Sequence, residues 1–336
     1  MQIAITGAGL LGSLLNWQLS KSAHEVTVFE SSSIGQKSSA AYVAASMLAP
    51  CSERIESSDE VWEQGIYSLY RWPEILQELD VPYGIDGSIV VAHGSDLRLL
   101  KKFESTLRHK YDITEIERLD RKALARLEPD LSPQFHQGLF LPLEGWLDNR
   151  NLLRRLAEST TNIRFDSPQD PQALVDQFDV VVDCRGVGAK TDEPELRSVR
   201  GEVVRVFAPE VELTRPIRLM HPKYQIYIAP RAENEYVIGA TQIESDSTAE
   251  PSVQSLLELL SAAYTVDTGF AEAEVIEINK GLRPAYPDNE PRVYWRDAVL
   301  SVNGLYRHGY LIAPAIVAQV VQVIEELCAL SSTVIR

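Results

Sequence analysis

The sequence has few of the features that mark secreted, metal-binding or membrane-spanning proteins. Its 336 residues hold three cysteines, Cys51, Cys184 and Cys328, and no CxxC pair. An odd number of widely separated cysteines argues against a disulfide framework and a zinc site, so we expect a reducing, cytoplasmic compartment. No run approaches 18 consecutive apolar residues, which predicts no membrane span, and the apolar N-terminus lacks the basic region and cleavage site of a signal peptide.

Positive charge is also scarce. The chain has 32 Lys and Arg against 48 Asp and Glu, a net charge of −16. Nucleic acids and anionic membranes are bound mainly through clustered Lys and Arg, so the charge argues against both as partners. The six histidines are scattered, and we recognise no metal-ligand cluster, Ser-His-Asp set or pair of carboxylates. We therefore expect no metal, and a small molecule as the main partner.

The length fits two domains, and two sequence patterns, one typical of α/β structure and one of antiparallel sheets, alternate along the chain. Residues 178–184, FDVVVDC, form the nearly continuous apolar run of a parallel strand buried on both faces, whereas residues 199–241 alternate like an antiparallel sheet with one covered face. This predicts a mixed α/β and α+β fold with two discontinuous domains. The α/β domain would comprise 1–75, 145–200 and 282–336, and the antiparallel-sheet domain 76–144 and 201–281. Residues 281–291 are expected to form a loop, and residues 312–330 a closing amphipathic helix.

A glycine motif joins the first predicted strand, residues 2–6, to a helix. Gly7 allows the tight turn, Gly9 leaves the backbone open to a pyrophosphate, and Gly12 lets helix and strand pack closely. The second predicted strand ends in Glu30, which can accept hydrogen bonds from ribose hydroxyls and would repel a 2′-phosphate. The motif predicts a dinucleotide site that disfavours NADP; the alternative is a glycine-rich packing turn.

The segment after Glu30 favours FAD over NAD. NAD proteins usually continue into another strand–helix unit, whereas residues 31–46 here are rich in Ser, Ala and Gly. Small and hydroxyl side chains would let the chain lie against a second phosphate and a ribityl chain. The alternative is a flexible loop.

These residues resemble the FAD-dependent D-amino-acid oxidase superfamily, the DAO family, and most of all its glycine-oxidase, ThiO-type branch. The resemblance runs along nearly the whole chain and rests on the order and spacing of six segments: the glycine motif with Glu30, SSAA…SMLAP at 38–50, RGE at 200–202, YIAPR…VIGAT at 227–241, GLRP at 281–284, and NGLYRHG…LIAP at 303–314. It implies an FAD domain of the glutathione-reductase type, with an antiparallel substrate domain roofing the flavin.

The resemblance also implies roles for particular residues. Arg283 would hold the substrate carboxylate, Tyr227 would bond the same carboxylate through its hydroxyl, and Arg307 would lie beside flavin and substrate. Ala49 and Gln242 would lie near the substrate. Gln242 departs from the pattern, because glycine oxidase carries an apolar residue there; Gln225, where that enzyme has a histidine, is a second departure. The cofactor-binding residues predicted from motif and resemblance are Gly7, Gly9, Leu10, Leu11, Gly12, Glu30, Ser38, Ser39, Ala40, Ser46, Met47, Leu48, Gly186, Gly304, Arg307, His308, Gly309, Tyr310 and Leu311.

The chemistry of these side chains supports the same roles. A guanidinium meets a carboxylate with two parallel hydrogen bonds and so locates the Cα–H, and a tyrosine hydroxyl adds a third donor. The alternatives are a surface ion pair of Arg283 with Asp288 or Glu290, sheet packing for Tyr227, and a structural role for Arg307.

The sequence thus predicts a non-covalent FAD enzyme that oxidises a small amino acid or amine, of the glycine, sarcosine or D-amino-acid type. Hydride transfer to flavin N5 needs no general base, and O2 would reoxidise the flavin to give H2O2. The N-terminus of the last helix, expected near Ala313 and Pro314, could stabilise negative charge on reduced flavin. Alternatives are a dehydrogenase with a quinone or protein acceptor, a flavoprotein that modifies a macromolecule, and a non-catalytic FAD-binding subunit of a complex. A homo-oligomer is left open.

Overall fold

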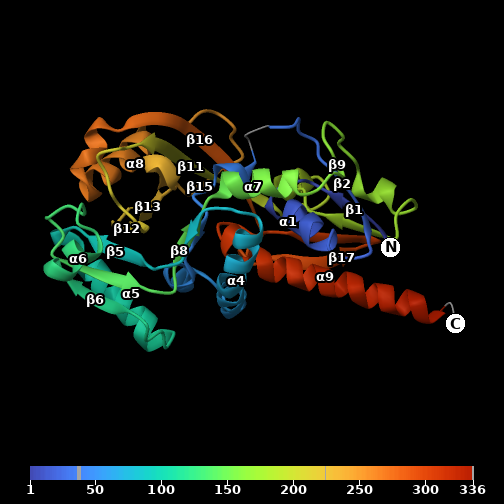
Figure 1. Cartoon of the computed structure of the whole chain (residues 1–336), viewed down its shortest axis with the longest axis horizontal. Coiled ribbons are helices and arrows are strands. Elements are labelled where there is room, and N and C mark those ends of the chain that lie inside the picture. Colours follow the sequence, from blue (N-terminus) through green and yellow to red (C-terminus); the bar gives the residue numbers. More distant parts are fainter. Residues whose placement is uncertain (36–38, 224, 335–336) are drawn as a thin grey trace.

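The computed structural model describes residues 1–35, 39–223 and 225–334 of the chain. It contains two large sheets side by side, with the long C-terminal helix α9 (Gly309–Val334) running along one end and projecting from it (Figure 1). A small three-stranded sheet lies between them. It is formed by β3 (Met47–Leu48), β8 (Gly145–Leu147) and β4 (Tyr83–Gly84).

The first sheet has six strands and is mainly parallel. Its order is β17 (Arg292–Arg296), β18 (Val299–Asn303), β10 (Val180–Asp183), β1 (Gln2–Thr6), β2 (Glu25–Phe29) and β9 (Ile163–Arg164). Only β17 pairs antiparallel. The four residues of β10 are all buried, as its apolar run predicts for a strand covered on both faces.

Helices and short turns cover this sheet. One face packs against α1 (Leu10–Leu19), α4 (Asp59–Glu78), α7 (Asn149–Glu158) and α9, which share the largest hydrophobic core with the sheet. The other face packs against Leu174 and Phe178, beside the 3-10 turn η3 (Pro171–Leu174).

The second sheet has nine strands and is mostly antiparallel. Its path is β15 (Ile243–Glu244), β11 (Arg197–Phe207), β14 (Glu235–Gly239), β13 (Gln225–Pro230), β12 (Ile217–Met220), β5 (Ser88–Ala92), β7 (Gln137–Leu141) and β6 (Glu117–Asp120), and β16 (Glu274–Ala285) pairs with β11. Helices α8 (Val253–Val266), α5 (Leu97–Lys110) and α6 (Arg121–Leu127) pack on it.

The boundaries of the two interleaved domains remain a prediction. The strands of the six-stranded sheet fall within 1–75, 145–200 and 282–336, while β11 and β16 of the second sheet run across residues 200 and 282. Both strands therefore continue across the predicted domain boundaries.

Strand β16 differs from the expected loop at 281–291. It continues through GLRP to Ala285, because these residues pair with Arg197–Gly201 of β11. Strand β17 was not predicted; its charged, half-exposed residues at the sheet edge hide the alternation that marks a strand.

Helix α9 also differs from its prediction, since it begins at Gly309 and places Pro314 inside the helix. A proline at this position cannot donate to the carbonyl of Tyr310 four residues earlier. The buried indole of Trp72 in α4 donates to that carbonyl instead, at 2.8 Å. The interior proline is therefore compensated by a tertiary contact.

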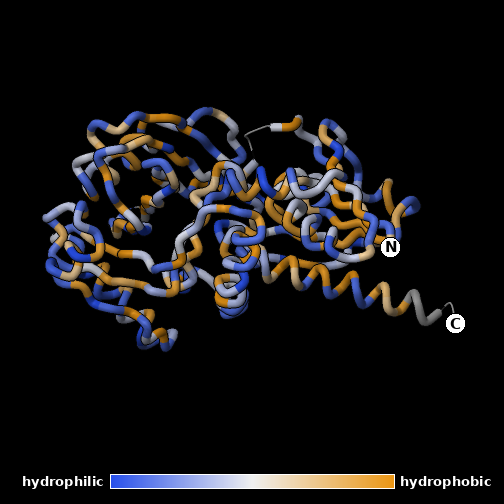
Figure 2. The backbone as a smooth tube through the Cα atoms, viewed as in Figure 1, coloured by the Kyte–Doolittle hydropathy of each residue, from blue (hydrophilic) through white to orange (hydrophobic). Residues whose placement is uncertain are grey.

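By length and composition, the Gly309–Leu330 part of α9 could cross a membrane, contrary to the count of consecutive apolar residues. Its apolar residues recur along the helix and are interrupted by polar ones (Figure 2). Ile312, Ile316, Val320 and Ile324 lie in the main core, and 44% of the apolar window is buried. The core helix of a globular domain passes the same test for this reason.

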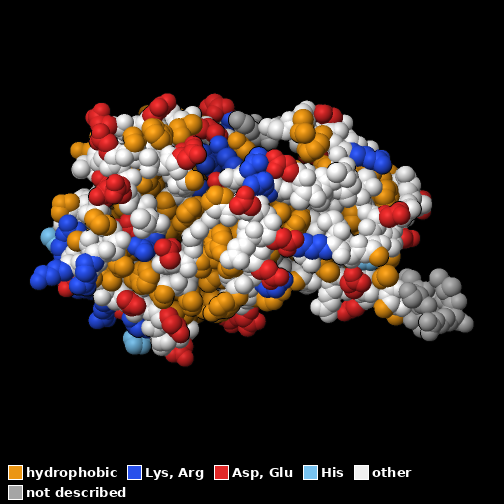
Figure 3. All heavy atoms as spheres, in the orientation of Figure 1, with side chains coloured by type: hydrophobic (Ala, Val, Ile, Leu, Met, Phe, Trp, Pro, Cys, Tyr) orange, Lys and Arg blue, Asp and Glu red, His pale blue; other side chains and the backbone are white. Residues whose placement is uncertain are grey.

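The basic side chains are unevenly distributed. On the face shown in Figure 3, Lys and Arg gather at the end formed by α5 and α6, whereas acidic side chains are spread over the rest. The net charge of −16 therefore does not describe every surface of the molecule.

Candidate active site

A cavity of about 2020 Å³ extends between the two large sheets. It is lined by the loops after β1, β10 and β18, by the segment from Ser39 to Ala49, and by the facing strands β11, β13 and β16. We call the part beside the glycine motif the nucleotide end, and the part around Arg283 the substrate end.

At the nucleotide end, the three motif glycines have different functions. Gly7 has a φ of +94°, and a Cβ there would lie 2.7 Å from the carbonyl oxygen of Cys184. A Cβ on Gly9 would meet nothing within 4 Å, which leaves the backbone open to the cavity. A Cβ on Gly12 would lie 1.9 Å from the carbonyl oxygen of Gly7, so this glycine serves packing and does not line the cavity.

Glu30 is held ionised beside this turn. Its carboxylate accepts hydrogen bonds from the backbone N–H of Ala8 at 2.6 Å and from the N–H and hydroxyl of Ser32 at 2.8 and 2.7 Å. Burial by itself would raise its pKa, but these hydrogen bonds outweigh burial and lower it. A charged acceptor that lines the cavity fits the ribose hydroxyls of an adenosine.

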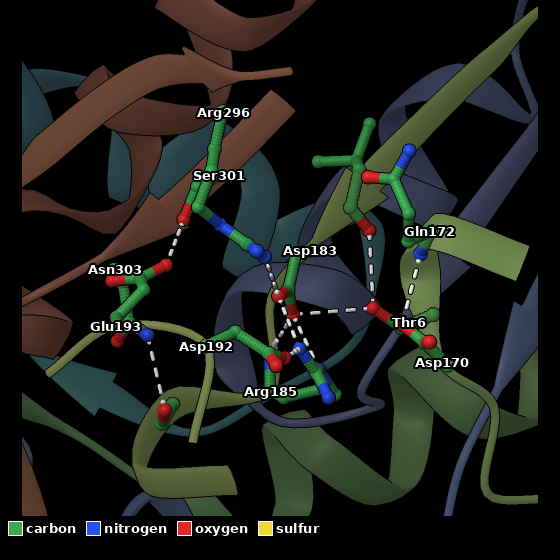
Figure 4. Close-up of polar contacts among 12 residues, drawn as sticks. Thr6, Asp170, Gln172, Asp183, Arg185, Asp192, Glu193, Arg296, Ser301 and Asn303 are labelled. Carbon is green, nitrogen blue, oxygen red and sulfur yellow. Dashed lines mark hydrogen bonds and ion pairs between the residues drawn. The ribbon is translucent and has the colours of Figure 1, made fainter. Parts of the chain in front are cut away.

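A network of polar contacts supports the neighbouring loop (Figure 4). Asp183, at the carboxyl end of β10, is buried and accepts from the Thr6 hydroxyl at 3.2 Å, from the Arg185 guanidinium at 2.7–2.8 Å and from Arg296 at 3.4 Å. Asp192 also pairs with Arg185. This network supports the turn that brings Gly186 to the cavity wall, and Gly7 packs against Cys184 and Arg185 at the start of that turn.

Most of the other predicted cofactor-binding residues line the cavity. They are Leu10, Leu11, Ser39, Ala40, Ser46, Met47, Arg307, His308, Gly309, Tyr310 and Leu311. Two others do not line it: Leu48 is fully buried in the core, and a Cβ at Gly304 would overlap the Tyr286 ring at 2.3 Å. Ser38 lies outside the described residues. The open turn, the charged Glu30 and the unobstructed Gly9 together fit an FAD lying along this end.

At the substrate end, Arg283 has the surroundings of a ligand-binding cation. Its guanidinium donates to the carbonyl of Thr241 at 3.1 Å and lies against Gly201, where a Cβ would be 2.2 Å from Nη2. Asp288 pairs instead with Arg292, and Glu290 accepts from Ser58, so the alternative of a surface ion pair is wrong. Within the described part of the chain, no carboxylate forms an ion pair with Arg283. Burial lowers its pKa, although a guanidinium stays protonated.

Arg307 has the opposite surroundings. Its Nε forms an ion pair with Glu53, and its Nη1 contacts Glu56 at 2.7 Å and Gln242 at 3.2 Å. Tyr227 donates its hydroxyl proton to Glu53 at 2.8 Å. In this arrangement neither side chain is fully available to a substrate carboxylate. The resemblance implies that Tyr227 bonds the substrate and that Arg307 lies beside it, but here both side chains contact Glu53.

Glu53 is a central residue of this site that the sequence did not reveal. Burial alone would raise its pKa, but Arg307, His308 and Arg218 lower it to about 2. The only signal was an acid following the apolar segment SMLAPC, and one such acid has no distinguishing spacing.

The remaining side chains complete the substrate end. Ala49 and Gln242 line the cavity, and Gln242 donates to the Tyr306 hydroxyl. His308 is 2% exposed, and burial lowers its pKa to about 4, so the ring is neutral near pH 7. Burial raises the pKa of Tyr227, which therefore keeps its proton. No group of three or more His, Cys, Asp or Glu in the described residues is placed to hold a metal ion.

Comparison with known proteins identifies the class to which this fold and site belong. The profile of the DAO family, described as FAD dependent oxidoreductase, matches residues 2–322, and the chain belongs to this family. It is an FAD-dependent oxidoreductase of the amino-acid oxidase family.

Particular relatives lie in the glycine-oxidase branch. The chain is 40% identical over 327 residues to a protein of Rhizobium etli named as a thiamine biosynthesis oxidoreductase, ThiO, covering 95% of each chain. It is 26% identical to the glycine oxidase of Geobacillus kaustophilus, covering 93% of this chain and 89% of that one. The crystal structure of the Geobacillus enzyme has the same fold, with a TM-score of 0.82 at 23% identity and coverage of 96% and 94%.

Proposed function

We propose that the enzyme oxidises a small amino acid, of the glycine, sarcosine or D-amino-acid type, to an imine that water then hydrolyses. The observation that carries this proposal is Arg283: a guanidinium without an ion-pair partner among the described residues, on the wall of the cavity that fits FAD. A substrate carboxylate would supply the missing counter-charge and would be fixed by two parallel hydrogen bonds.

When bound, FAD supplies the hydride acceptor, and we propose that O2 reoxidises it to give H2O2. The residues of the chain would position the substrate: Arg283 holds the carboxylate, and β13 and β16 form facing walls of the cavity around it. Among the described side chains around Arg283, burial lowers the pKa of His308 to about 4 and the neighbouring cations lower that of Glu53 to about 2, so neither is basic enough to remove a proton near pH 7. The amine would therefore have to reach the site in its neutral form.

The cysteines support non-covalent FAD and a reducing compartment. Cys51 and Cys184 are buried and Cys328 lies on α9, and in the described part of the chain none of the three forms a disulfide. Burial raises the pKa of both buried thiols, so neither is a thiolate near pH 7. We propose that FAD is held without a bond to the protein and that the enzyme is cytoplasmic.

The test is anaerobic titration of the purified yellow protein with glycine, sarcosine and D-amino acids, followed by admission of air. We expect at least one of them to bleach the flavin, with rapid recovery of colour in air. Slow recovery would favour a dehydrogenase, and no bleaching with any of them would overturn the amino-acid proposal.

A second arm uses Arg283→Ala. We expect about a 10³-fold loss of kcat/KM, since removing one partner of a buried charge pair costs 2–5 kcal/mol. FAD content and absorbance should stay unchanged, because Arg283 lies at the substrate end. An unaltered rate would contradict the role of Arg283.

A further inference from the structure

We propose that Glu53 restricts the enzyme to monocarboxylic substrates by occupying Arg307, and that removing this carboxylate admits amines carrying two carboxylates. This inference rests on the proposed function, in which Arg283 holds the first carboxylate. It concerns what the second arginine of the same cavity can bind.

The contacts of Arg307 leave it one available donor. A guanidinium can hold a carboxylate with two hydrogen bonds along either of two edges, Nε with Nη2 or Nη1 with Nη2. Glu53 blocks Nε by forming an ion pair with it, while Glu56 and Gln242 contact Nη1. Nη2 is buried and has no hydrogen-bond partner in the part of the chain that the structure describes. Each edge has therefore lost one of its two donors, and a second substrate carboxylate could be met by only one hydrogen bond.

Glu53 is the more firmly fixed of the two acids on Arg307. Its side chain is 11% exposed, against 46% for Glu56. Its Oε1 accepts from Tyr227 at 2.8 Å, and its Oε2 lies 3.3 Å from Nδ1 of His308. Because three side chains hold Glu53 in place, it cannot swing away to free Arg307 without leaving buried donors unpaired.

The charges lead to the same conclusion. Arg283 and Arg307 carry two positive charges and face two acids, Glu53 and Glu56. Glu56 is half exposed and screened by solvent, so the buried Glu53 is the acid that cancels one positive charge inside the cavity. A substrate with one carboxylate and a neutral amine matches the charge that remains. A second carboxylate directed at Arg307 would also face Glu53, and like charges repel strongly in a desolvated site. Glycine and sarcosine avoid this repulsion. Iminodiacetate, which is glycine with a second carboxymethyl group on nitrogen, does not.

The test is Glu53→Gln, which keeps the shape of the side chain and removes its charge. Stopped-flow flavin reduction would give kcat/KM for sarcosine and for iminodiacetate. We expect the iminodiacetate-to-sarcosine ratio to rise on the order of 10- to 100-fold. Glu56→Gln should raise it less, because Glu56 is half exposed. Glu63→Gln, the same change at an exposed position of α4, should leave it at the wild-type value.

Two further measurements identify the cause. Adding Arg307→Met to Glu53→Gln should return the ratio to the wild-type value, because the gain requires the freed guanidinium. A ratio that stays within threefold of wild type in Glu53→Gln, or a gain that persists without Arg307, would overturn the proposal.

A binding experiment needs neither turnover nor a variant that folds. Acetate and malonate would be titrated into wild-type holoenzyme while the flavin absorbance is followed. We expect acetate to bind at least about tenfold more tightly than malonate; equal or tighter binding of malonate would contradict the inference. If none of the amino acids bleaches the flavin yet acetate still outcompetes malonate, the proposed oxidation fails while the selection of monocarboxylates stands.

Discussion

The two ends of the cavity are built in different ways. The nucleotide end is built mainly from one stretch of chain, β1, the glycine turn, α1 and β2, joined by the turn after β10, and it presents backbone together with Glu30. The substrate end brings together Glu53, Tyr227, Arg283 and Arg307, which are far apart in the sequence and act through charged side chains. The first end therefore depends on close backbone packing, and the second on the balance of buried charges.

This difference predicts that the two ends fail in different ways. A substitution at the nucleotide end should release the cofactor, because the backbone atoms that form this end are too closely packed to accommodate a new side chain. A substitution at the substrate end should leave FAD bound and change turnover, specificity or pH dependence.

The largest effect is expected for Gly12→Ala at the nucleotide end. The new Cβ would lie 1.9 Å from the carbonyl oxygen of Gly7, so α1 must move away from β1. We expect a colourless protein that is destabilised by about 3 kcal/mol or more, the upper range for overpacking. FAD content after purification and urea unfolding would measure this. Gly94→Ala, with nothing within 4 Å of the new Cβ, is the control. A Gly12→Ala protein that retains a full complement of FAD would contradict the prediction.

An intermediate effect is expected from Glu144, a buried acid behind the substrate end. It accepts from the backbone N–H of Ser52 at 2.5 Å and from the hydroxyl of Ser88, but burial outweighs these hydrogen bonds and raises its pKa from 4.5 to about 7. Between pH 4.5 and 7, the folded protein holds a proton that the unfolded chain has lost, so this group's contribution to stability falls as pH rises.

The size of this effect follows from the shift, which corresponds to at most about 3 kcal/mol. Glu144→Gln cannot titrate, so wild type should lose stability relative to the variant between pH 4.5 and 7.5. Urea unfolding of both proteins across this range would measure the difference. Parallel pH profiles would show that Glu144 does not titrate in this window.

The smallest effect is expected for Gly201→Ala at the substrate end. The new Cβ would meet the end of the Arg283 side chain, which can move, so stability should change by less than about 1 kcal/mol. The displaced guanidinium should lower kcat/KM by about 10- to 100-fold, since a shift of 1 Å can cost that much. Steady-state kinetics would measure the loss of kcat/KM, with FAD content as the control. If the variant keeps the kcat/KM of wild type, Arg283 does not need the space that Gly201 leaves.

The sequence predicted the nucleotide end more completely than the substrate end. Gly7, Gly9 and Glu30 lie on the cavity as the motif indicates, whereas Gly12 and Gly304 make room for packing. The predicted start of α9 was wrong by several residues. Pro314 suggested the helix terminus, but it lies inside the helix because the Trp72 indole donates to the carbonyl that this proline leaves unpaired. Such contacts join residues that are distant in the chain, so no local sequence pattern predicts them.

By itself, the sequence determined the strand–turn–helix unit, because glycine spacing and strand periodicity act within a few residues of one another. It also singled out Arg283 and Arg307 through resemblance, without indicating how they differ. Only the tertiary structure decided that Arg283 has no carboxylate partner among the described residues while Arg307 is neutralised by Glu53. The physical reason is that the availability of a charge depends on its neighbours in space, and those neighbours come from separate segments of the chain.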